Sequence, residues 1–474
     1  MAAVPPTTSA NLPDASDASP LQPPERDLGR AIATDREPQL QSNQCGMEMG
    51  TLSGNTAKCS TLSLYSESSE WNMSTKKEWI AIAACCWSVF SVGWNDATTG
   101  PLLPAFQAHY GVSFTVVSML FVSNCVGFLS AAVVNIRLTD QLGLGKIILF
   151  GAVLQVLAYS LLAPALPFPV MCVAYAINGF GVGFQDAQAN GFIAGLPKKS
   201  SEKMGLLHAV YGAGAFVSPL VATQFAQSTR WSFHYLISLG LAIINTITLL
   251  VVFRLRRQHE ITGQPDPKLA YYTENAKISG NDNKYKEIFS SRAVQLMSFF
   301  IWVYVGLEVT IGGWIVTFII DERGGGPSSG YISSGFFGGL MLGRVVLLWV
   351  NKKIGERRVI YVYCILCIGL ELVVWLVPHL VGNAVAVSMV GLLLGKPMYP
   401  IAMNVTNTIV PKRIITESIG WIASFGQAGS AVFPFMTGAL AEKHSVKVMQ
   451  PLVVGMTGVL IVLWTLIPRP TNGK

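Results

Sequence analysis

The chain has 474 residues, of which 51% are hydrophobic and only 12% are charged, about half the charged fraction of a typical soluble domain. A soluble fold of this size cannot cover so much apolar surface, so the composition excludes one. The net charge of +7 is scattered over polar connections instead of forming one patch, and we therefore expect no nucleic-acid partner.

The first 78 residues are predicted to be a disordered cytoplasmic tail. Residues 1–70 are rich in Pro, Ser, Thr, Asn and Gln, contain few aromatic residues and lack the basic-then-apolar pattern of a secretory signal. Twelve apolar segments follow, and about 20 residues suffice for each span. The predicted spans are 79–100, 114–135, 146–163, 169–195, 203–224, 231–253, 293–320, 328–350, 357–377, 382–409, 417–441 and 449–468.

The spans fall into two groups of similar length, 79–253 and 293–474, the second including a short tail. A polar, charged linker at 254–292 separates them. Two parallel groups of six helices around a site at mid-membrane are typical of the major facilitator architecture. The predicted fold is therefore an all-α membrane protein with 12 transmembrane helices in two pseudo-symmetric six-helix bundles.

The connections between spans alternate in charge. One side carries 21 Lys and Arg residues and the other carries four. Cytoplasmic connections retain basic residues, so both termini are predicted to be cytoplasmic, and we expect a multi-pass protein of the plasma membrane.

Cysteines and known catalytic motifs give no sign of an enzyme. The eight cysteines lie in the tail or in apolar segments, and Cys364-x-x-Cys367 lies in a span, where a packing role is favoured. The sequence contains neither a P-loop nor a His-Glu-x-x-His zinc motif. We expect no enzymatic activity, no cofactor and no metal site.

Charged residues inside the spans are the main functional signal. A charge at mid-membrane costs about 2.5–3.5 kcal/mol on insertion scales, so it is kept mainly where a cavity or a partner receives it. A desolvated carboxylate can bind and release a proton at physiological pH. The charged residues well inside the predicted spans, away from their ends, are Asp96, Asp186, Glu308, Glu371, Lys396 and Arg344.

The fourth span holds the densest group of polar residues. Asp186 lies among Asn178, Gln185, Gln188 and Asn190. Such a group forms either a solute or proton site or a cluster of hydrogen bonds between helices, and the first interpretation is favoured. Counting 1.5 Å per residue places Asp186 in the cytoplasmic half of its span.

Two further polar groups are candidates for the same cavity. His208 lies near the cytoplasmic start of the fifth span, with Tyr211 about one turn later, and a structural role for the histidine is the alternative. In the first span, Asn95 and Asp96 precede Pro101, so this helix is expected to kink, and backbone groups freed there would also need polar partners.

Three charges in the second half leave their roles open. Glu308 and Lys396 lie near the centres of the seventh and tenth spans, where they form a structural ion pair or bind substrate. Lys396 is flanked by Gly395 and Pro397, which predicts an interrupted helix of the kind that lines transporter sites. Glu371 lies in the ninth span, which this architecture places at the periphery, so a structural role is favoured.

These residues resemble the fucose–galactose–glucose:proton symporter family of the major facilitator superfamily, particularly its fungal members, over residues 79–468. Gly181-x-Gly183-x-x-Asp186-x-x-Ala189-Asn190 is similar to the family pattern that carries an essential acid. Asn95-Asp96 followed by Leu102-Leu103-Pro104 resembles a first-span pattern whose Asp is linked to proton coupling, with four extra residues before the Leu-Leu-Pro. The resemblance implies that Asp186 and Asp96 act in coupling.

A loop after the second span resembles the signature that latches the two halves in one state. It reads Asp140-x-x-Gly143-x-Gly145-Lys146, with Leu144 where an Arg is usual. Asp140, Gly143 and Lys146 are therefore expected to take part in gating, together with Arg344 in the eighth span. Lys396 departs from the family pattern and favours an anionic solute over a neutral hexose.

The sequence thus predicts a secondary transporter that moves a small polar solute, a sugar or an organic acid, by alternating access. Proton symport is favoured, and the expected partners are the solute, protons and membrane lipid, with the chain a monomer. A proton-antiport exporter of a drug or secondary metabolite is the first alternative. A nutrient receptor that does not transport and signals through its tail is the second.

Overall fold

A computed structural model describes residues 73–263, 284–395, 398–411 and 414–468, and all regular structure among them is helical. The predicted tail lies outside the described residues except at its end, and the middle of the linker and Lys396 also lie outside them. The helices of the first half are α2 (Thr75–Tyr110), α3 (Phe114–Val117), α4 (Met119–Leu142), α5 (Leu144–Leu162), α6 (Phe168–Ala194), α7 (Ser200–Ala226) and α8 (His234–Phe253).

The second half repeats this order of helices. It consists of α12 (Arg292–Arg323), α13 (Gly330–Ile354), α14 (Glu356–Leu376), α15 (Leu380–Leu394), α16 (Met398–Ile409), α17 (Ile415–Gln427), α18 (Gly429–His444) and α19 (Met449–Leu466). Short helices α9 (Gln258–Thr262) and α11 (Lys284–Ser290) belong to the linker region. We call the helix ends predicted to face the cytoplasm, where α2 begins and α19 ends, the inner ends, and the opposite ends the outer ends.

The helices have the length and composition of membrane spans. Ten helical segments of the described residues are long and apolar enough to cross a membrane. The remaining two predicted spans correspond to α13, whose 25 residues are about 37 Å long, and to the pair α17 and α18. The all-α membrane fold predicted from the sequence is therefore confirmed.

Two spans of the second half are interrupted near their middles. α15 ends at Leu394 and α16 begins at Met398, as predicted from the neighbouring Gly and Pro residues. α17 ends at Gln427 and α18 begins at Gly429, which the sequence did not lead us to expect. Discontinuous helices are typical of transporter sites, because they leave backbone groups for a solute or an ion.

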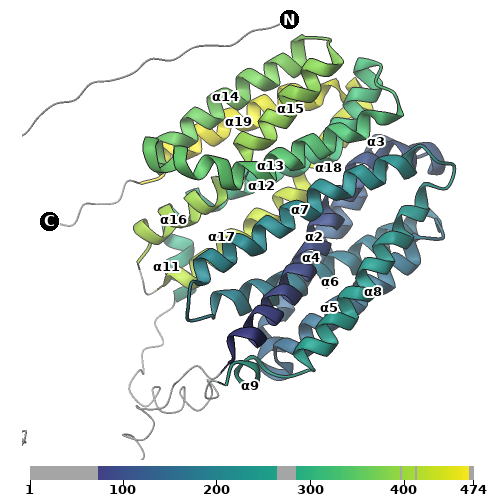
Figure 1. Ribbon diagram of the computed structural model, residues 1–474. Helices are drawn as coiled ribbons and strands as arrows, with labels where there is room; N and C mark the ends of the chain where they lie inside the picture. Colours follow the sequence, from purple (N-terminus) through teal and green to yellow (C-terminus); the bar gives the residue numbers. More distant parts are fainter. Residues whose placement is uncertain (1–72, 264–283, 396–397, 412–413, 469–474) are drawn as a thin grey trace, which may run out of the picture. The chain divides into compact units, whose positions relative to one another are not determined.

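The helices form two bundles (Figure 1). In the first, α2 packs against α7, and α6 packs between α4 and α5, with α8 on α5. In the second, α12 packs against α17, α18 and α19, while α15 packs between α13 and α14. The two bundles meet through α7 and α13 and through α2 and α12.

The outer half of the interface between the bundles is tightly closed. A Cβ atom on Gly100 of α2 would lie 2.1 Å from the carbonyl oxygen of Gly312 of α12, so only glycine permits this approach. Trp314 is fully buried beside Phe114 and Phe121 of the other bundle. The amide of Thr115 also donates to the carboxylate of Glu442, at 3.4 Å.

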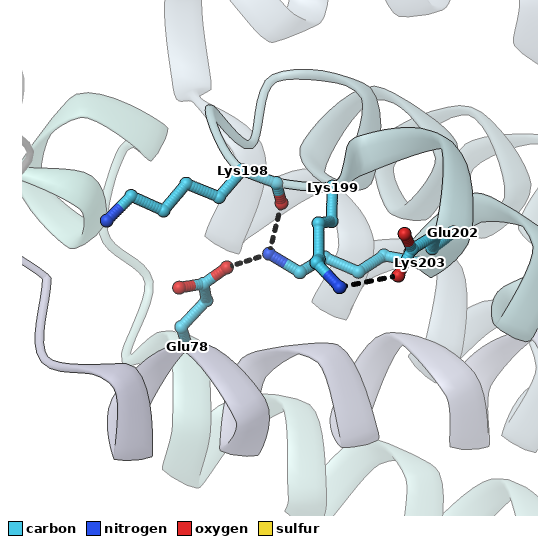
Figure 2. Close-up of polar contacts among 5 residues, drawn as sticks. All are labelled: Glu78, Lys198, Lys199, Glu202 and Lys203. Atoms are coloured by element: carbon cyan, nitrogen blue, oxygen red, sulfur yellow. Dashed lines mark hydrogen bonds and ion pairs between the residues drawn. The ribbon is translucent and has the colours of Figure 1, made fainter. Parts of the chain in front are cut away.

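Polar contacts hold the inner end of the first bundle together. Figure 2 shows Lys203 of α7 forming an ion pair with Glu78 of α2, with both side chains about nine-tenths buried. Lys203 also donates to the carbonyl of Lys198, at 2.6 Å, whereas the neighbouring pair Lys199 and Glu202 is exposed to solvent. The Glu78–Lys203 pair therefore connects the start of α2 to the connection between α6 and α7.

Candidate functional site

A cavity lies between the two bundles. The space in it that the centres of water molecules can occupy is about 80 Å³. Both bundles line it, at the level where α17 gives way to α18. Its apolar walls include Leu120, Phe121 and Phe337. The polar residues that line it are Asn95, Asp96, Thr99, Asn124, Tyr175, Tyr211, Glu308, Gln427 and Ser430.

Asp96 is the best-connected acid of this cavity. Tyr211 donates its hydroxyl hydrogen to one carboxylate oxygen at 2.8 Å, and the Asn95 amide donates to the other at 3.2 Å. The side-chain oxygen of Asn95 accepts in turn from the Asn178 amide at 2.5 Å and from the Tyr159 hydroxyl at 3.3 Å. Helices α5, α6 and α7 thus fix the surroundings of a carboxylate carried by α2.

Glu308 lies in the same cavity but belongs to the second bundle, on α12. It interacts electrostatically with Asp96 and with Arg344. The described residues that line the cavity include no lysine or arginine. Whether Glu308 pairs with Lys396 stays a prediction, because Lys396 lies outside the described residues.

Hydroxyl groups line the outer part of the cavity. The Tyr175 hydroxyl is 3.2 Å from the Thr99 hydroxyl and 3.0 Å from that of Tyr235. On the α4 side, the Asn124 side-chain oxygen is buried without a hydrogen-bond partner among the described residues. Hydroxyl and amide groups beside tyrosine rings can bind a small polyhydroxy solute through hydrogen bonds.

Four predicted site residues, Asn95, Asp96, Tyr211 and Glu308, therefore lie together. The site predicted from the sequence did not include Thr99, Tyr175, Gln427 and Ser430, which also line the cavity. The last two flank the interruption at Ala428, and Gly426 and Gly429 beside it were the signal available in the sequence.

Asp186 and Asn190 form a neighbouring pair on α6 that does not line the cavity. The Asn190 amide donates to the Asp186 carboxylate at 2.9 Å and to its backbone carbonyl at 2.8 Å. Eleven residues, about 16 Å of helix, separate Asp186 from the cavity residue Tyr175. Asp186 still interacts electrostatically with Asp96.

Gln185 is placed differently from the expectation. Its side chain is fully buried within the first bundle, where its oxygen accepts from Ser88 and Asn245, both at 2.6 Å. Its amide group donates to Gln155 at 2.7 Å. These contacts correspond to the interhelical hydrogen-bond cluster that was the alternative interpretation, and Gln185 does not line the cavity.

The residues expected to gate lie in two places. Arg344 is inside α13, not in a loop, and donates to the backbone carbonyl of His208 on α7. Asp140, Gly143 and Lys146 lie at the inner end, where the backbone of Gly143 lies against the Arg257 side chain. Arg257 donates to the backbone carbonyl of residue 141, at 2.9 Å, so the beginning of the linker packs on this loop.

Metal chemistry finds no support within the described ranges, where no group of three or more His, Cys, Asp or Glu side chains could hold an ion.

Two helical bundles with a polar cavity between them, lined by an acid from each, are typical of membrane transporters. The sequence model of the Major Facilitator Superfamily matches residues 85–434, and the chain belongs to this superfamily. It is a transporter and not an enzyme.

Three similar proteins match most of the length of the chain. Bypass of stop codon protein 6 of Saccharomyces cerevisiae is 25% identical over 415 residues, covering 83% of each chain. The glucose/mannose transporter GlcP of Bacillus subtilis is 19% identical and covers 78% of this chain and 90% of its own. A glucose/galactose transporter of Brucella abortus is 22% identical, covering 73% and 83%.

Solved structures share the fold at low sequence identity. Crystal structures of the peptide transporter POT and the nucleoside transporter NupG each match with a TM-score of 0.65 and 12% identity. They cover 84% and 82% of this chain, respectively, and 100% of their own chains.

Proposed function

We propose that the protein carries a small polar solute, a sugar, together with a proton across the plasma membrane by alternating access. The observation that carries the proposal is the placement of Asp96: a carboxylate in the cavity between the bundles, hydrogen-bonded to Tyr211 and Asn95 and facing Glu308. The chain acts as a monomer in this proposal, with its inner ends in the cytoplasm.

Physical reasons favour a proton as the coupled ion. Asp96 and Glu308 place two acids in one small cavity whose described lining includes no basic side chain, and Arg344, outside this lining, interacts with Glu308. Closing the cavity removes water from these acids, which raises the cost of keeping both ionised. A proton on Asp96 removes one charge, so the closed cavity becomes easier to form once a proton is bound.

The cavity and the relatives together favour a neutral sugar. Tyrosine rings, amides and hydroxyls line the space, and the two carboxylates disfavour an anion. Two relatives are named as transporters of glucose with mannose or galactose. An organic acid would need a cation at the site, a role for which Lys396 is the candidate.

The test is solute accumulation in proteoliposomes under an imposed pH gradient. We expect the wild-type protein to concentrate at least one of glucose, mannose and galactose when the outside is more acidic. Asp96→Asn should abolish this accumulation and keep exchange of solute at equal pH, because an amide can bind hydroxyls but cannot titrate. Glu371→Gln is the matched control, a buried carboxyl residue outside the cavity.

Accumulation of sugar by Asp96→Asn at the wild-type level would remove Asp96 from the proton path. Accumulation of sugar acids in preference to neutral sugars would reassign the substrate. Export driven by the same gradient would favour the antiport alternative.

A further inference from the structure

Arg344 reaches from one bundle to the other on the inner side of the cavity. It belongs to α13, and its guanidinium donates to the backbone carbonyl of His208 on α7. The same group lies over the ring of Tyr211, with its central carbon 5.3 Å from the ring centre. Such a distance is within the range of a cation–π interaction.

The local sequence of α7 makes room for this contact. A Cβ atom on Gly212 would lie 3.3 Å from the Arg344 guanidinium and 3.1 Å from the Met341 side chain. Glycine at this position therefore lets α13 approach the turn of α7 that carries His208 and Tyr211.

Arg344 is joined to Asp96 through one side chain. The Tyr211 ring contacts the guanidinium, and the Tyr211 hydroxyl donates to the Asp96 carboxylate at 2.8 Å. The Arg344 Nε atom is buried and has no hydrogen-bond partner among the described residues, so the guanidinium depends on the partners at its other end.

Titratable groups from the neighbouring helices surround Arg344, Tyr211 and Asp96. Glu308 and Tyr304 of α12 interact electrostatically with Arg344. Asp186 of α6 and Tyr159 of α5 do so with Asp96, and His208 lies on α7 beside Tyr211.

We propose that Arg344 is a positioning residue for proton coupling: through Tyr211 it makes the contact between α7 and α13 depend on the charge of Asp96. This inference rests on the proposed binding of a proton by Asp96. An ionised Asp96 accepts a charge-assisted hydrogen bond from Tyr211, which moves electron density into the ring and strengthens its attraction for the guanidinium.

When Asp96 takes a proton from cavity water, its hydrogen bond from Tyr211 weakens, and so does the attraction between the Tyr211 ring and Arg344. Among the described residues, Arg344 then keeps its interactions with Glu308 and Tyr304 and its hydrogen bond to the His208 carbonyl, and the inner halves of α7 and α13 can separate more easily. The distance between them therefore increases as the pH falls through the titration of Asp96, even when no solute is bound.

The experiment measures that distance without substrate. Spin labels at Leu206→Cys on α7 and Val346→Cys on α13, both exposed positions, report it in a background whose native cysteines are replaced and which retains transport. Distance distributions are recorded from about pH 8 to about pH 5. The variants are Arg344→Gln, Arg344→Lys, Tyr211→Phe and Asp96→Asn.

Arg323→Gln is the matched control. Arg323 also donates to two backbone carbonyls, those of Val374 and Trp375, and lies 5.0 Å from the ring centre of Phe318, but all these partners belong to its own bundle. If losing any arginine of the second bundle were enough to abolish the pH dependence of the distance, Arg323→Gln would therefore lose it as well.

We expect the distance to increase at low pH in the wild type and in Arg323→Gln. Arg344→Gln, Tyr211→Phe and Asp96→Asn should lose this pH dependence, and Arg344→Lys, which keeps the charge but not the flat guanidinium, should shift its midpoint by about one pH unit, a tenfold change in proton affinity. A wild-type pH profile in Arg344→Gln and Tyr211→Phe overturns the inference, as does a wild type whose distance does not respond to pH.

The two proposals fail separately. If Asp96→Asn abolishes sugar accumulation while Arg344→Gln keeps the wild-type pH profile, the role of Asp96 stands and that of Arg344 falls. If Asp96→Asn accumulates sugar normally, the proposed coupling falls whatever the spin labels report.

Discussion

The two bundles repeat the same order of helices but are held together by different interactions. In the first bundle, paired polar side chains cross between helices, as Gln185 does with Ser88, Gln155 and Asn245. In the described part of the second bundle, several side chains that cross between helices donate to backbone carbonyls instead, as Trp314 does to Pro434 and Tyr304 to Leu394; two spans are interrupted, and the buried Glu371 carboxyl group has no hydrogen-bond partner.

This difference indicates that the two bundles have different roles in transport. Hydrogen-bonded side chains are directional, so the first bundle holds Asp96 and its neighbours in one arrangement. The two interrupted spans allow the second bundle to change shape around the cavity.

The largest expected effect concerns the buried ion pair of the first bundle. Glu78→Leu leaves the Lys203 ammonium buried without its partner, which should lower the free energy of unfolding by about 3–5 kcal/mol. Thermal or denaturant unfolding in detergent measures the change. The double variant Glu78→Leu with Lys203→Met should recover most of the loss, and equal stability of the two variants would contradict this explanation.

The polar centre of the first bundle should show the next largest effect. Gln185→Leu removes the partner of Ser88, Gln155 and Asn245 together, and we expect a loss of about 3 kcal/mol at about 1 kcal/mol for each group left unpaired. The same unfolding measurement applies. If solute affinity falls while stability is kept, Gln185 belongs to the binding site and not to the framework.

The closed outer interface should respond to one methyl group. Gly100→Ala places a Cβ against the Gly312 carbonyl, so it should disfavour the outer-closed state by about 1–3 kcal/mol and leave the outer-open state unaffected. In a Phe121→Cys background, Gly100→Ala should make an external thiol reagent label the new cysteine faster. Gly369→Ala, at a glycine with no atom within 4 Å of the added Cβ, is the control and should leave labelling unchanged.

The smallest expected effect is in the second bundle. Glu371→Gln has no hydrogen bond to lose among the described residues and removes a buried acid that has no partner there, so the free energy of unfolding should not fall by more than about 1 kcal/mol. A loss as large as that of Gln185→Leu would show that the second bundle also depends on a polar contact and would remove the contrast.

Much of the fold followed from the sequence, because apolar length and the alternation of basic connections report directly on membrane spans. The predicted interruption near Gly395 is confirmed, since Gly and Pro act on the backbone locally. The break at Ala428 was not predicted, because glycines such as Gly426 and Gly429 also occur inside continuous helices where two helices pack closely, as both do against α12.

The site was less accessible to sequence reasoning. Charge alone identified Asp96 and Glu308, since a charge in a span needs a cavity or a partner. Gln185 and Asp186 are adjacent in the sequence and point in directions about 100° apart on a helix, so one faces the core of the bundle and the other does not. Which residue faces which way depends on the neighbouring helices, information that one sequence does not contain.

In the proposed mechanism, solute and proton move together through Asp96. The most direct measurement uses proteoliposomes with a trapped pH-sensitive dye and no imposed gradient, to which the transported sugar is added outside. We expect sugar entry to acidify the lumen in the wild type and in Glu371→Gln, and we expect no pH change in Asp96→Asn. Sugar entry without acidification in the wild type, or with normal acidification in Asp96→Asn, would contradict coupling through Asp96.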